Sequence, residues 1–227
     1  MSQYIFFILL DIPAEHEAEF NTVYDTDHLP YILQVPGVSD CTRYKLEWSD
    51  NPDMIRYLGI YHIDDPDLPR SEAWKKQGTL GRWPKDIRQH VTARRNGALR
   101  QIFHTEAASF SSGPHKDATN SDYIYFLQQS IPAEYDAKFN ELYNGDHIPL
   151  MMQAPGAKAC TRYKLKYSDT GDTPDYLAIY AIDKADTPRS PEWKKQTSLG
   201  AWPTQIRPHF TARRNGVYRR VSVINSK

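Results

Sequence analysis

Hydrophobic and polar residues alternate along this chain with two periods, one typical of strands and one typical of helices. Residues 4–12 (YIFFILLDI) are apolar almost throughout, which indicates a strand buried on both faces. Residues 14–28 (AEHEAEFNTVYDTDH) follow Pro13 and place apolar side chains at helical spacing, with glutamates on the opposite face. Pro30 is expected to interrupt this helix.

The next seventy residues predict two further strands, a short helix and a last strand. VSDCTRYKLEW at 38–48 alternates as a strand does, and YLGIYHI at 57–63 is rich in β-forming residues. Ser71 suits the N-cap of a short amphipathic helix, and HVTARRNGALRQIF at 90–103 predicts the last strand. The order βαββαβ is that of a ferredoxin-like unit, a four-stranded antiparallel sheet with its helices on one face.

The whole succession of patterns is written twice. The stretch IPAE at residues 12–15 returns at 131–134, and TARRNG at 92–97 returns at 211–216. Both displacements equal 119 residues (131 − 12 and 211 − 92), with no gap between them. The chain is therefore a tandem duplication, and this decides how the rest of it is interpreted.

The duplication predicts two ferredoxin-like units, at residues 1–104 and 122–227. Residues 105–121 between them are rich in small and polar side chains, so we expect a linker that buries little. Each unit alone would leave one apolar face of its sheet exposed to water. We therefore expect an α+β fold in which the two sheets cover each other, an intramolecular pseudo-dimeric α/β barrel with the helices outside.

Composition narrows the partners and the compartment. The 28 basic and 28 acidic side chains give a formal net charge of zero, so no basic excess favours nucleic acid. No apolar run approaches the ~20 residues of a membrane-spanning helix, and the N-terminal run lacks the marks of a signal peptide. Two cysteines at equivalent repeat positions argue against a disulfide. We expect a cytoplasmic protein that binds a small molecule, with homodimer formation left open.

One motif resembles that of a known family. FNTVYDTDHLPYILQVPGV at residues 20–38 is similar to the first-helix signature of EthD-like proteins in the dimeric α/β-barrel superfamily. The YLGIY strand and the TARRNG tail fit the same pattern, and the resemblance covers both repeats. The second copy departs from the signature at three positions, where Asp25, Thr26 and Leu29 become Asn144, Gly145 and Ile148.

The resemblance implies a fold and a pocket more than a reaction. It implies a pocket within one half, between the sheet and its helices, with a recurring histidine that matches His28 and His147. The superfamily includes lactone isomerases, polyketide cyclases, dehydratases, cofactor-free monooxygenases, haem enzymes and proteins with no known activity. Because one fold hosts all of these, function has to be argued from the site.

The repeated clusters YDTDHLP and YNGDHIP supply the candidate catalytic residues. His28 and His147 titrate near neutral pH and suit proton transfer at a carbon or oxygen acid. Asp27 could orient His28, and Tyr24, one helical turn earlier, could donate a hydrogen bond. In the alternative interpretation the His-Pro junction only ends a helix, and the aspartate caps the turn that follows.

Other residues supply candidate substrate contacts. An arginine that points from a strand into a pocket can hold a carboxylate or phenolate, although an ion pair at the solvent edge explains it equally well. Most strand tyrosines are core residues, and some bind an oxygen of a ligand. The candidate substrate-binding residues are Arg43, Tyr44, Tyr61, Tyr143, Arg162 and Tyr180.

Differences between the repeats favour the first pocket. His62 shares a strand face with Leu58 and Ile60, is replaced by Ala181 in the second copy, and is a further candidate catalytic residue. Three more first-copy residues are replaced, Asp11 by Ser130, Tyr31 by Leu150 and Trp48 by Tyr167. The first half therefore has more titratable groups, and if only one pocket is active we expect it to be the first.

No cofactor motif is visible. The sequence has no GxGxxG or Walker loop for a nucleotide and no HExxH or CxxC pattern for a metal. We therefore expect no cofactor and no metal, unless the fold brings distant ligands together or one histidine ligates a haem.

These observations predict a cofactor-independent lyase or isomerase acting on a small oxygenated aromatic, polyketide-like or lactone substrate. His28 would transfer the proton, Tyr24 or Tyr61 would polarise an oxygen, and Arg43 would bind an anionic group. The alternatives are a cofactor-free monooxygenase of phenols and a non-catalytic binding protein whose repeated motif only marks the fold.

Overall fold

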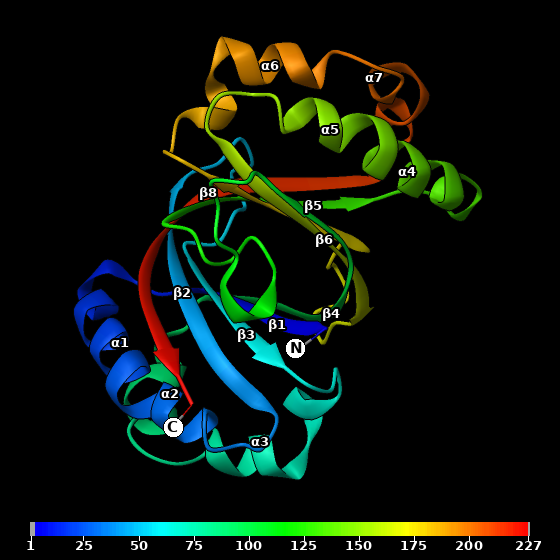
Figure 1. The fold of residues 1–227 in the computed structure, drawn as a ribbon. Coiled ribbons are helices and arrows are strands. Elements are labelled where there is room, and N and C mark those ends of the chain that lie inside the picture. Colours follow the sequence, from blue (N-terminus) through cyan, green and yellow to red (C-terminus); the bar gives the residue numbers. More distant parts are fainter. Residues whose placement is uncertain (1–2, 227) are drawn as a thin grey trace.

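Eight strands form one closed antiparallel barrel in the computed structural model, which describes residues 3–226 (Figure 1). The strands are β1 (Tyr4–Asp11), β2 (Val38–Trp48), β3 (Tyr57–Ile63), β4 (Ala93–Glu106), β5 (Tyr123–Ser130), β6 (Ala157–Tyr167), β7 (Tyr176–Ile182) and β8 (Ala212–Asn225). Around the barrel their order is β1-β3-β2-β8-β5-β7-β6-β4. The predicted pseudo-dimeric α/β barrel is confirmed.

The barrel repeats itself after four strands, as a dimer of two identical sheets would. Each strand of the first half has its counterpart four places further round, so that β1 corresponds to β5 and β2 to β6. The halves are joined at two seams, where β2 pairs with β8 and β4 pairs with β6. The long last strand of each unit therefore extends into the sheet of the other unit, and the barrel has no free sheet edge.

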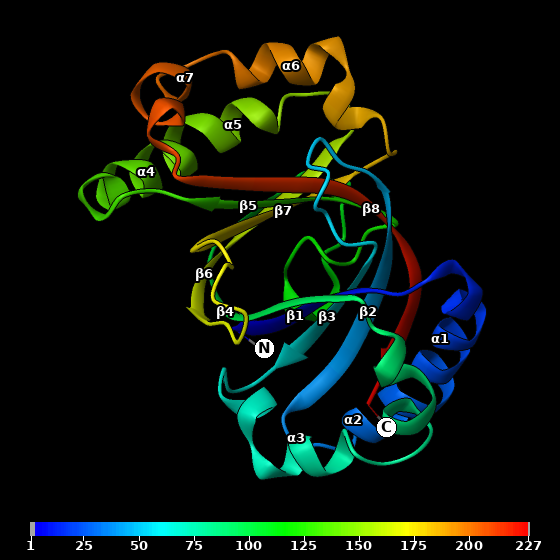
Figure 2. The ribbon, with the colours of Figure 1, turned by 180° about the vertical axis from the view of Figure 1, so that it is seen from behind.

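The helices form one layer outside each half of the barrel. The first layer contains α1 (Glu17–Val23), α2 (Leu29–Ile32) and α3 (Glu72–Gln77), and the second contains α4 (Asp136–Leu142), α5 (Ile148–Met151), α6 (Pro191–Thr197) and α7 (Trp202–Gln205). Three π-helical turns lie at Tyr24–His28, Trp83–Ile87 and Tyr143–His147. Short 3₁₀ turns are Ala14–His16, Leu68–Arg70, Arg88–His90, Gly113–His115, Ala133–Tyr135, Thr187–Arg189 and Arg207–His209. Seen from behind, the two helical layers lie on opposite sides of the barrel (Figure 2).

The sequence predicted that Pro30 interrupts the first helix, and this prediction is wrong. The chain instead passes from α1 through the π-helical turn Tyr24–His28 directly into α2, where Pro30 occupies one of the first positions. The backbone N–H of Leu29 donates to the carbonyl of Tyr24, five residues earlier. Because the helix is continuous here, the missing N–H of Pro30 removes one intrahelical hydrogen bond, and the irregular π-helical turn lies directly before it.

Three apolar clusters fill the space inside the barrel and beneath each helical layer. Along β1, Ile5, Phe7 and Leu9 point into the barrel, whereas Phe6 and Leu10 point toward the first helices. The strand is therefore buried on both faces, as its continuous apolar run predicted. Packing in the barrel is tight, since a Cβ added to Gly97 would lie 2.8 Å from the ring of Phe7 on the neighbouring strand and 2.9 Å from Leu165 across the seam.

The expectation that residues 105–121 bury little is wrong. Residues 113–121, here called the plug, enter one end of the barrel, and the exposed fractions of Asp117, Ala118 and Thr119 are 1%, 0% and 3%. Figure 1 shows this green segment within the ring of strands. Small polar side chains can be buried when partners satisfy their hydrogen bonds, and the barrel supplies such partners.

Other sequence predictions stay predictions. The division into units 1–104 and 122–227 with a linker at 105–121, the cytoplasmic location and a homodimer are not decided by this architecture. None of the helices in the described part of the chain is both long and apolar enough to cross a membrane.

Candidate active-site cavities and the barrel-mouth network

The first cavity lies between the sheet of the first half and its helices, where the resemblance placed a pocket. Its volume is about 630 Å³. Its wall includes Phe6, Ile8, Leu10, Tyr24, His28, Tyr61, Trp74, Lys75, Trp83, Arg88, Arg94 and Asp169. An aromatic and aliphatic wall with a few convergent polar groups is typical of small-molecule sites.

The π-helical turn places Tyr24 and His28 side by side over the sheet. The two rings pack edge to face, with centroids 5.1 Å apart, and the equivalent Tyr143 and His147 do the same at 5.2 Å. The turn is π-helical in both copies, Tyr24–His28 and Tyr143–His147. Single π-turns inside helices are rare and frequently mark functional sites.

His28 is a neutral imidazole in the wall of the first cavity. Its ring stacks on Trp83 at 4.7 Å between centroids, and its Nδ1 atom is buried without a hydrogen-bond partner among the described residues. Burial, together with the nearby charges of Arg88 and Arg43, lowers the pKa of His28 to about 3. At neutral pH the ring is therefore unprotonated, and it could act as a base only where a substrate anion formed beside it offsets the factors that disfavour the imidazolium.

Tyr24 and Tyr61 form a buried phenol pair beside His28. Their hydroxyl oxygens lie 2.9 Å apart, and both side chains are almost completely buried. Burial raises the pKa of both hydroxyl groups well above the usual value for tyrosine. One hydroxyl donates to the other, and the hydroxyl of Tyr61 also bonds to the buried thiol of Cys41.

Arg43 does not form an ion pair at the solvent edge. It is 2% exposed and lies behind the ring of Tyr24, with its guanidinium carbon 4.5 Å from the ring centroid. It donates to Asp25 at 2.6 Å and to Asn21 at 2.8 Å. Arg43 does not line the first cavity. Its counter-ion in this structure is the carboxylate of Asp25.

The carboxylate of Asp27 forms hydrogen bonds with the loop at residues 82–83 and not with His28. Its Oδ1 atom accepts from the backbone N–H of Arg82 at 2.7 Å and of Trp83 at 3.3 Å. Gly81 beside it has φ of +69°, and a Cβ there would lie 2.3 Å from the same oxygen. These contacts fix the position of Trp83, on which the imidazole of His28 stacks.

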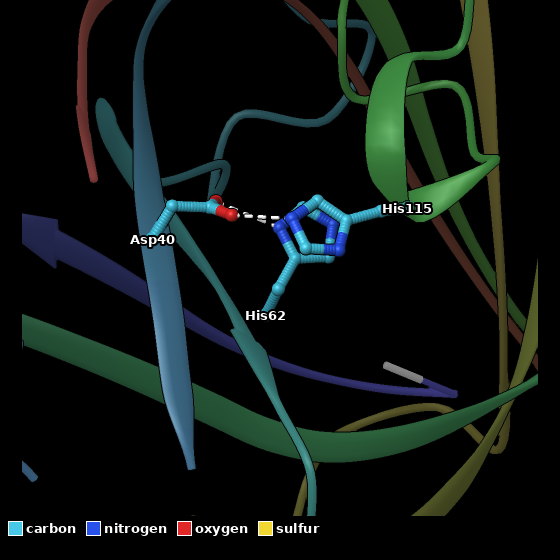
Figure 3. Close-up of side chains that lie close together, drawn as sticks. All are labelled: Asp40, His62 and His115. Atoms are coloured by element: carbon cyan, nitrogen blue, oxygen red, sulfur yellow. Dashed lines mark hydrogen bonds and ion pairs between the residues drawn. The ribbon is translucent and has the colours of Figure 1, made fainter. Parts of the chain in front are cut away.

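Tyr44 and His62 belong to a different compartment. Adjacent strand residues point to opposite faces, so His62 faces the barrel interior while Tyr61 faces the helices. The interior position of His62 lies next to the plug (Figure 3). The candidate residues of the first half therefore divide between the surroundings of the first cavity and a second group. We call this second group the barrel-mouth network: Asp40, Tyr44, His62, His115, Asp117, Thr119 and Tyr163.

His62 lies between two buried carboxylates. Its Nδ1 atom is 2.8 Å from Asp40 and its Nε2 atom is 2.7 Å from Asp117 of the plug. Burial opposes the charge of the ring, but the carboxylates of Asp117 and Asp40 outweigh it and raise the pKa of His62 to about 9. Burial alone would raise the pKa of Asp40 and of Asp117. His115 and His62 nevertheless lower the pKa of Asp40 to about 2. His62 and Thr119 likewise hold the pKa of Asp117 well below its usual range.

The rest of the network ties the plug to both halves of the barrel. Tyr163 of the second half donates to Asp117 at 3.0 Å, and Tyr44 of the first half donates to the carbonyl of Thr119. His115 of the plug bonds to the second oxygen of Asp40. The positions equivalent to Asp40 and His62 are Ala159 and Ala181, which explains why the network is asymmetric.

Asp40, His62 and His115 also bring three possible metal-ligand atoms within 4.8 Å of one another. Their geometry is that of a hydrogen-bond network. The rings of His62 and His115 stack nearly parallel, 3.7 Å apart with an interplanar angle of 6°, so their nitrogen lone pairs point side by side and do not converge (Figure 3). Both nitrogens of His62 are already bound to carboxylates.

The second cavity occupies the equivalent place in the second half. Its volume is about 370 Å³, and its wall includes Tyr125, Leu127, Gln129, His147, Tyr180, Trp193, Thr197, Trp202, Arg207 and Arg213. His147 stacks on Trp202, its Nδ1 atom is also without a partner among the described residues, and burial with Arg207 and Arg162 lowers its pKa to about 3. The hydroxyl groups of Tyr143 and Tyr180 are 3.3 Å apart.

Sequence reasoning missed several residues of these sites. Trp83, Arg88 and Arg94 of the first cavity recur at the 119-residue offset, so the repeat itself could have indicated them. His115 and Asp117 of the barrel-mouth network lie between the repeats, where neither spacing nor duplication gave a signal.

Comparison with known proteins supports the barrel architecture. No protein-family model and no curated protein sequence matches the chain. An anthrone oxidase-like protein superposes with a TM-score of 0.66 at 10% identity, over 100% of this chain and 96% of that chain. Chlorite dismutase from Candidatus Nitrospira defluvii, in complex with imidazole, superposes with a TM-score of 0.59 at 12% identity, over 96% and 91%.

A protein from Fusobacterium nucleatum subsp. nucleatum ATCC 25586, provisionally described as a monooxygenase, also has this fold. Its TM-score is 0.59 at 10% identity, and the match covers 99% of this chain and 95% of that one. Identities this low support the fold alone. The dimeric α/β-barrel fold is therefore supported, and membership of the superfamily and of the EthD-like family within it stays a prediction.

Proposed function

We propose that the protein is an enzyme acting on a small molecule in the first cavity, and that His28 begins the reaction by removing a proton. The observation that carries this proposal is the neutral imidazole of His28 in an aromatic cavity, next to the Tyr24–Tyr61 pair. A general base must be neutral and within reach of the substrate, and burial keeps this one neutral.

The neighbouring groups suit a substrate that becomes an anion when it loses the proton. When Tyr61 donates to Tyr24, the O–H of Tyr24 would donate to a carbonyl oxygen and stabilise the enolate that forms there. Arg88 and Arg94 in the wall add positive charge, and Arg94 has no ion-pair partner among the described residues. Arg43 would act behind Tyr24, through the charge it places under that ring, and not as a direct substrate contact.

The simplest outcome is elimination, ring closure or isomerisation of a small oxygenated aromatic, polyketide-like or lactone substrate. His28 accepts a proton from carbon, and the imidazolium returns it to another atom of the substrate or to a leaving hydroxyl group. No electrons are gained or lost, so the reaction needs no redox cofactor. This is the lyase or isomerase that the sequence predicted.

A cofactor-free monooxygenase is the second candidate, favoured by the likeness to an anthrone oxidase-like protein and to the Fusobacterium protein. It would share the first step, because a phenolate or enolate is the electron-rich species that dioxygen attacks. One oxygen atom would enter the substrate and the other would leave as water, with all four electrons supplied by converting a phenol to a quinone.

Hydrogen–deuterium exchange of a bound ligand tests the shared first step. A thermal-shift screen of phenols, aromatic acids and lactones would first identify a ligand, since a compound that binds only the native state raises its melting temperature. NMR in D₂O would then follow loss of the acidic C–H. We expect His28→Gln to slow this exchange by about 100-fold or more, whereas the matched variant His147→Gln leaves it nearly unchanged.

Oxygen dependence separates the two reactions. Product formation that continues without oxygen supports the lyase or isomerase, and consumption of one O₂ per substrate supports the monooxygenase. If a ligand binds but neither exchanges nor turns over with wild-type protein, the chain is a binding protein and the proposal is wrong.

A further inference from the structure

We propose that the second cavity is a binding site for a small organic anion, with a function different from that of the first cavity. The two cavities derive from the same duplicated segment, but the charges around them have diverged. Three features of the second half carry this inference: a buried cation without a counter-ion, a cavity wall without a carboxylate, and additional polar groups in that wall.

The buried cation is Arg162, the equivalent of Arg43. It is 1% exposed, and its guanidinium lies 4.2 Å from the ring centroid of Tyr143. It donates to Asn144 at 2.6 Å and to Asn140 at 2.9 Å, both through side-chain amide oxygens. No carboxylate among the described residues pairs with it, whereas Arg43 has Asp25 at 2.6 Å.

A buried charge without a counter-ion is costly, and it favours an anion nearby. Burial lowers the pKa of Arg162, which shows that this cation is poorly compensated. Its positive field reaches the cavity, because Arg162 helps to lower the pKa of His147 in the wall. The substitution of Asn144 for the aspartate of the first copy therefore leaves the buried arginine behind the second cavity without the negative charge that Asp25 supplies behind the first.

The wall of the second cavity is positively charged, as Arg162 behind it is. Arg207 and Arg213 line it, and no aspartate or glutamate is among its lining residues. The first cavity has three cations in its wall, Lys75, Arg88 and Arg94, but also a carboxylate, Asp169, contributed by the other half of the chain. The equivalent of Asp169 is Asp50, whose side chain is 60% exposed, lies 4.0 Å from Arg189 and is outside the wall of the second cavity.

Other replacements make this wall more polar and its cavity smaller. Tyr125, Gln129 and Thr197 stand where the first cavity has Phe6, Leu10 and Gly78. Arg213 already donates to the hydroxyl group of Tyr125 at 3.1 Å. A cavity of about 370 Å³ suits a single-ring acid, whose ring would pack against Trp193 and Trp202 while its carboxylate faces the arginines.

The test uses benzoate as the anionic probe and benzyl alcohol as its neutral counterpart, with binding to the full-length protein followed by isothermal titration calorimetry. We expect one benzoate per chain and no measurable binding of benzyl alcohol. Asn144→Asp gives Arg162 the counter-ion of the first copy and should weaken benzoate binding about tenfold. Arg213→Gln should weaken it at least as much, whereas Arg94→Gln, the same change in the first cavity, should not.

The chain supplies its own control for folding. Asp25 and Asn144 bind their arginines at the same distance of 2.6 Å, so exchanging the two residue types preserves the local geometry. Asp25→Asn, which removes the counter-ion of Arg43, should add weak benzoate binding at the first cavity. The proposal is independent of His28, since His28→Gln should bind benzoate as wild type does.

Three results would overturn it: no binding of benzoate by wild-type protein at millimolar concentration, equal affinity for benzyl alcohol, or loss of binding in Arg94→Gln instead of Arg213→Gln. The first result would show that the positive wall is satisfied by solvent, the second that charge plays no part, and the third that the anion binds the first cavity.

Discussion

Raising the pH should weaken the attachment of the plug to the barrel, because neutral His62 can donate to only one of its two carboxylates. The pKa of His62 rises from an ordinary 6.5 to about 9 on folding, against the effect of burial, through the carboxylates of Asp117 and Asp40. A folded-state pKa above the unfolded value means that the native state binds the proton more tightly. Its contribution to stability is therefore complete below pH 6.5 and is lost as the pH rises through 9.

The size of the effect follows from that difference in pKa. One pKa unit corresponds to about 1.4 kcal/mol, so the charged His62 contributes about 3 kcal/mol to the free energy of unfolding at low pH. Between pH 7 and pH 9.5 the loss should be about 2 kcal/mol. Asp40 and Asp117 stay ionised across this window because their pKa values are lowered.

Urea unfolding at pH 7, 8 and 9.5 measures this loss directly. The matched control is the triple variant Asp40→Ala, His62→Ala, Asp117→Asn, which gives two of the three positions the alanines that the second half has at Ala159 and Ala181. It leaves every other titrating group in place. If wild type and the triple variant lose the same free energy of unfolding between pH 7 and 9.5, His62 is not the group that titrates and the reasoning is refuted.

Four further outcomes are expected. Asp117→Asn, which leaves His62 with one carboxylate, should destabilise the protein by about 3 kcal/mol or more in urea unfolding and should speed trypsin cleavage after Lys116; unchanged cleavage would contradict the role of the plug. Asp27→Ala should cost about 1 kcal/mol in the same assay by removing a cap from two backbone N–H groups, and a larger loss of ligand exchange than of stability would mean that Asp27 acts on His28 directly. Tyr61→Phe should lower the rate of ligand exchange more than it weakens ligand binding, and the reverse pattern would make Tyr61 a simple binding residue. The rate of that exchange should be constant from pH 5 to pH 8, since the lowered pKa of His28 keeps it neutral, whereas a fall below pH 6.5 would contradict the buried position of the base.

The local patterns of the chain were sufficient for most of the fold, and the family resemblance indicated where the first cavity lies. Duplication at a 119-residue offset, a βαββαβ order and one apolar sheet face per unit leave few arrangements besides a barrel with helices outside. Helical spacing placed Tyr24 one turn from His28, and the contact of their rings follows from that spacing. These features depend on neighbours within a few residues, or on the repeat, and both can be seen in a sequence.

Strand alternation also required Tyr61 and His62 to face opposite sides, but it could not say which side faced the helices. The partners of His62 were decided by the tertiary structure alone. A segment of small polar residues between the repeats has no hydrophobic pattern to fix its path. Its burial depends on partners such as Tyr163, His62 and Tyr44, which lie 46, 55 and 75 residues away in the chain. Whether Arg162 has a counter-ion likewise depends on which side chains meet behind Tyr143. Periodicity records which face of an element is buried; it does not record which charges meet once the elements have packed, because those contacts are set by the fold as a whole.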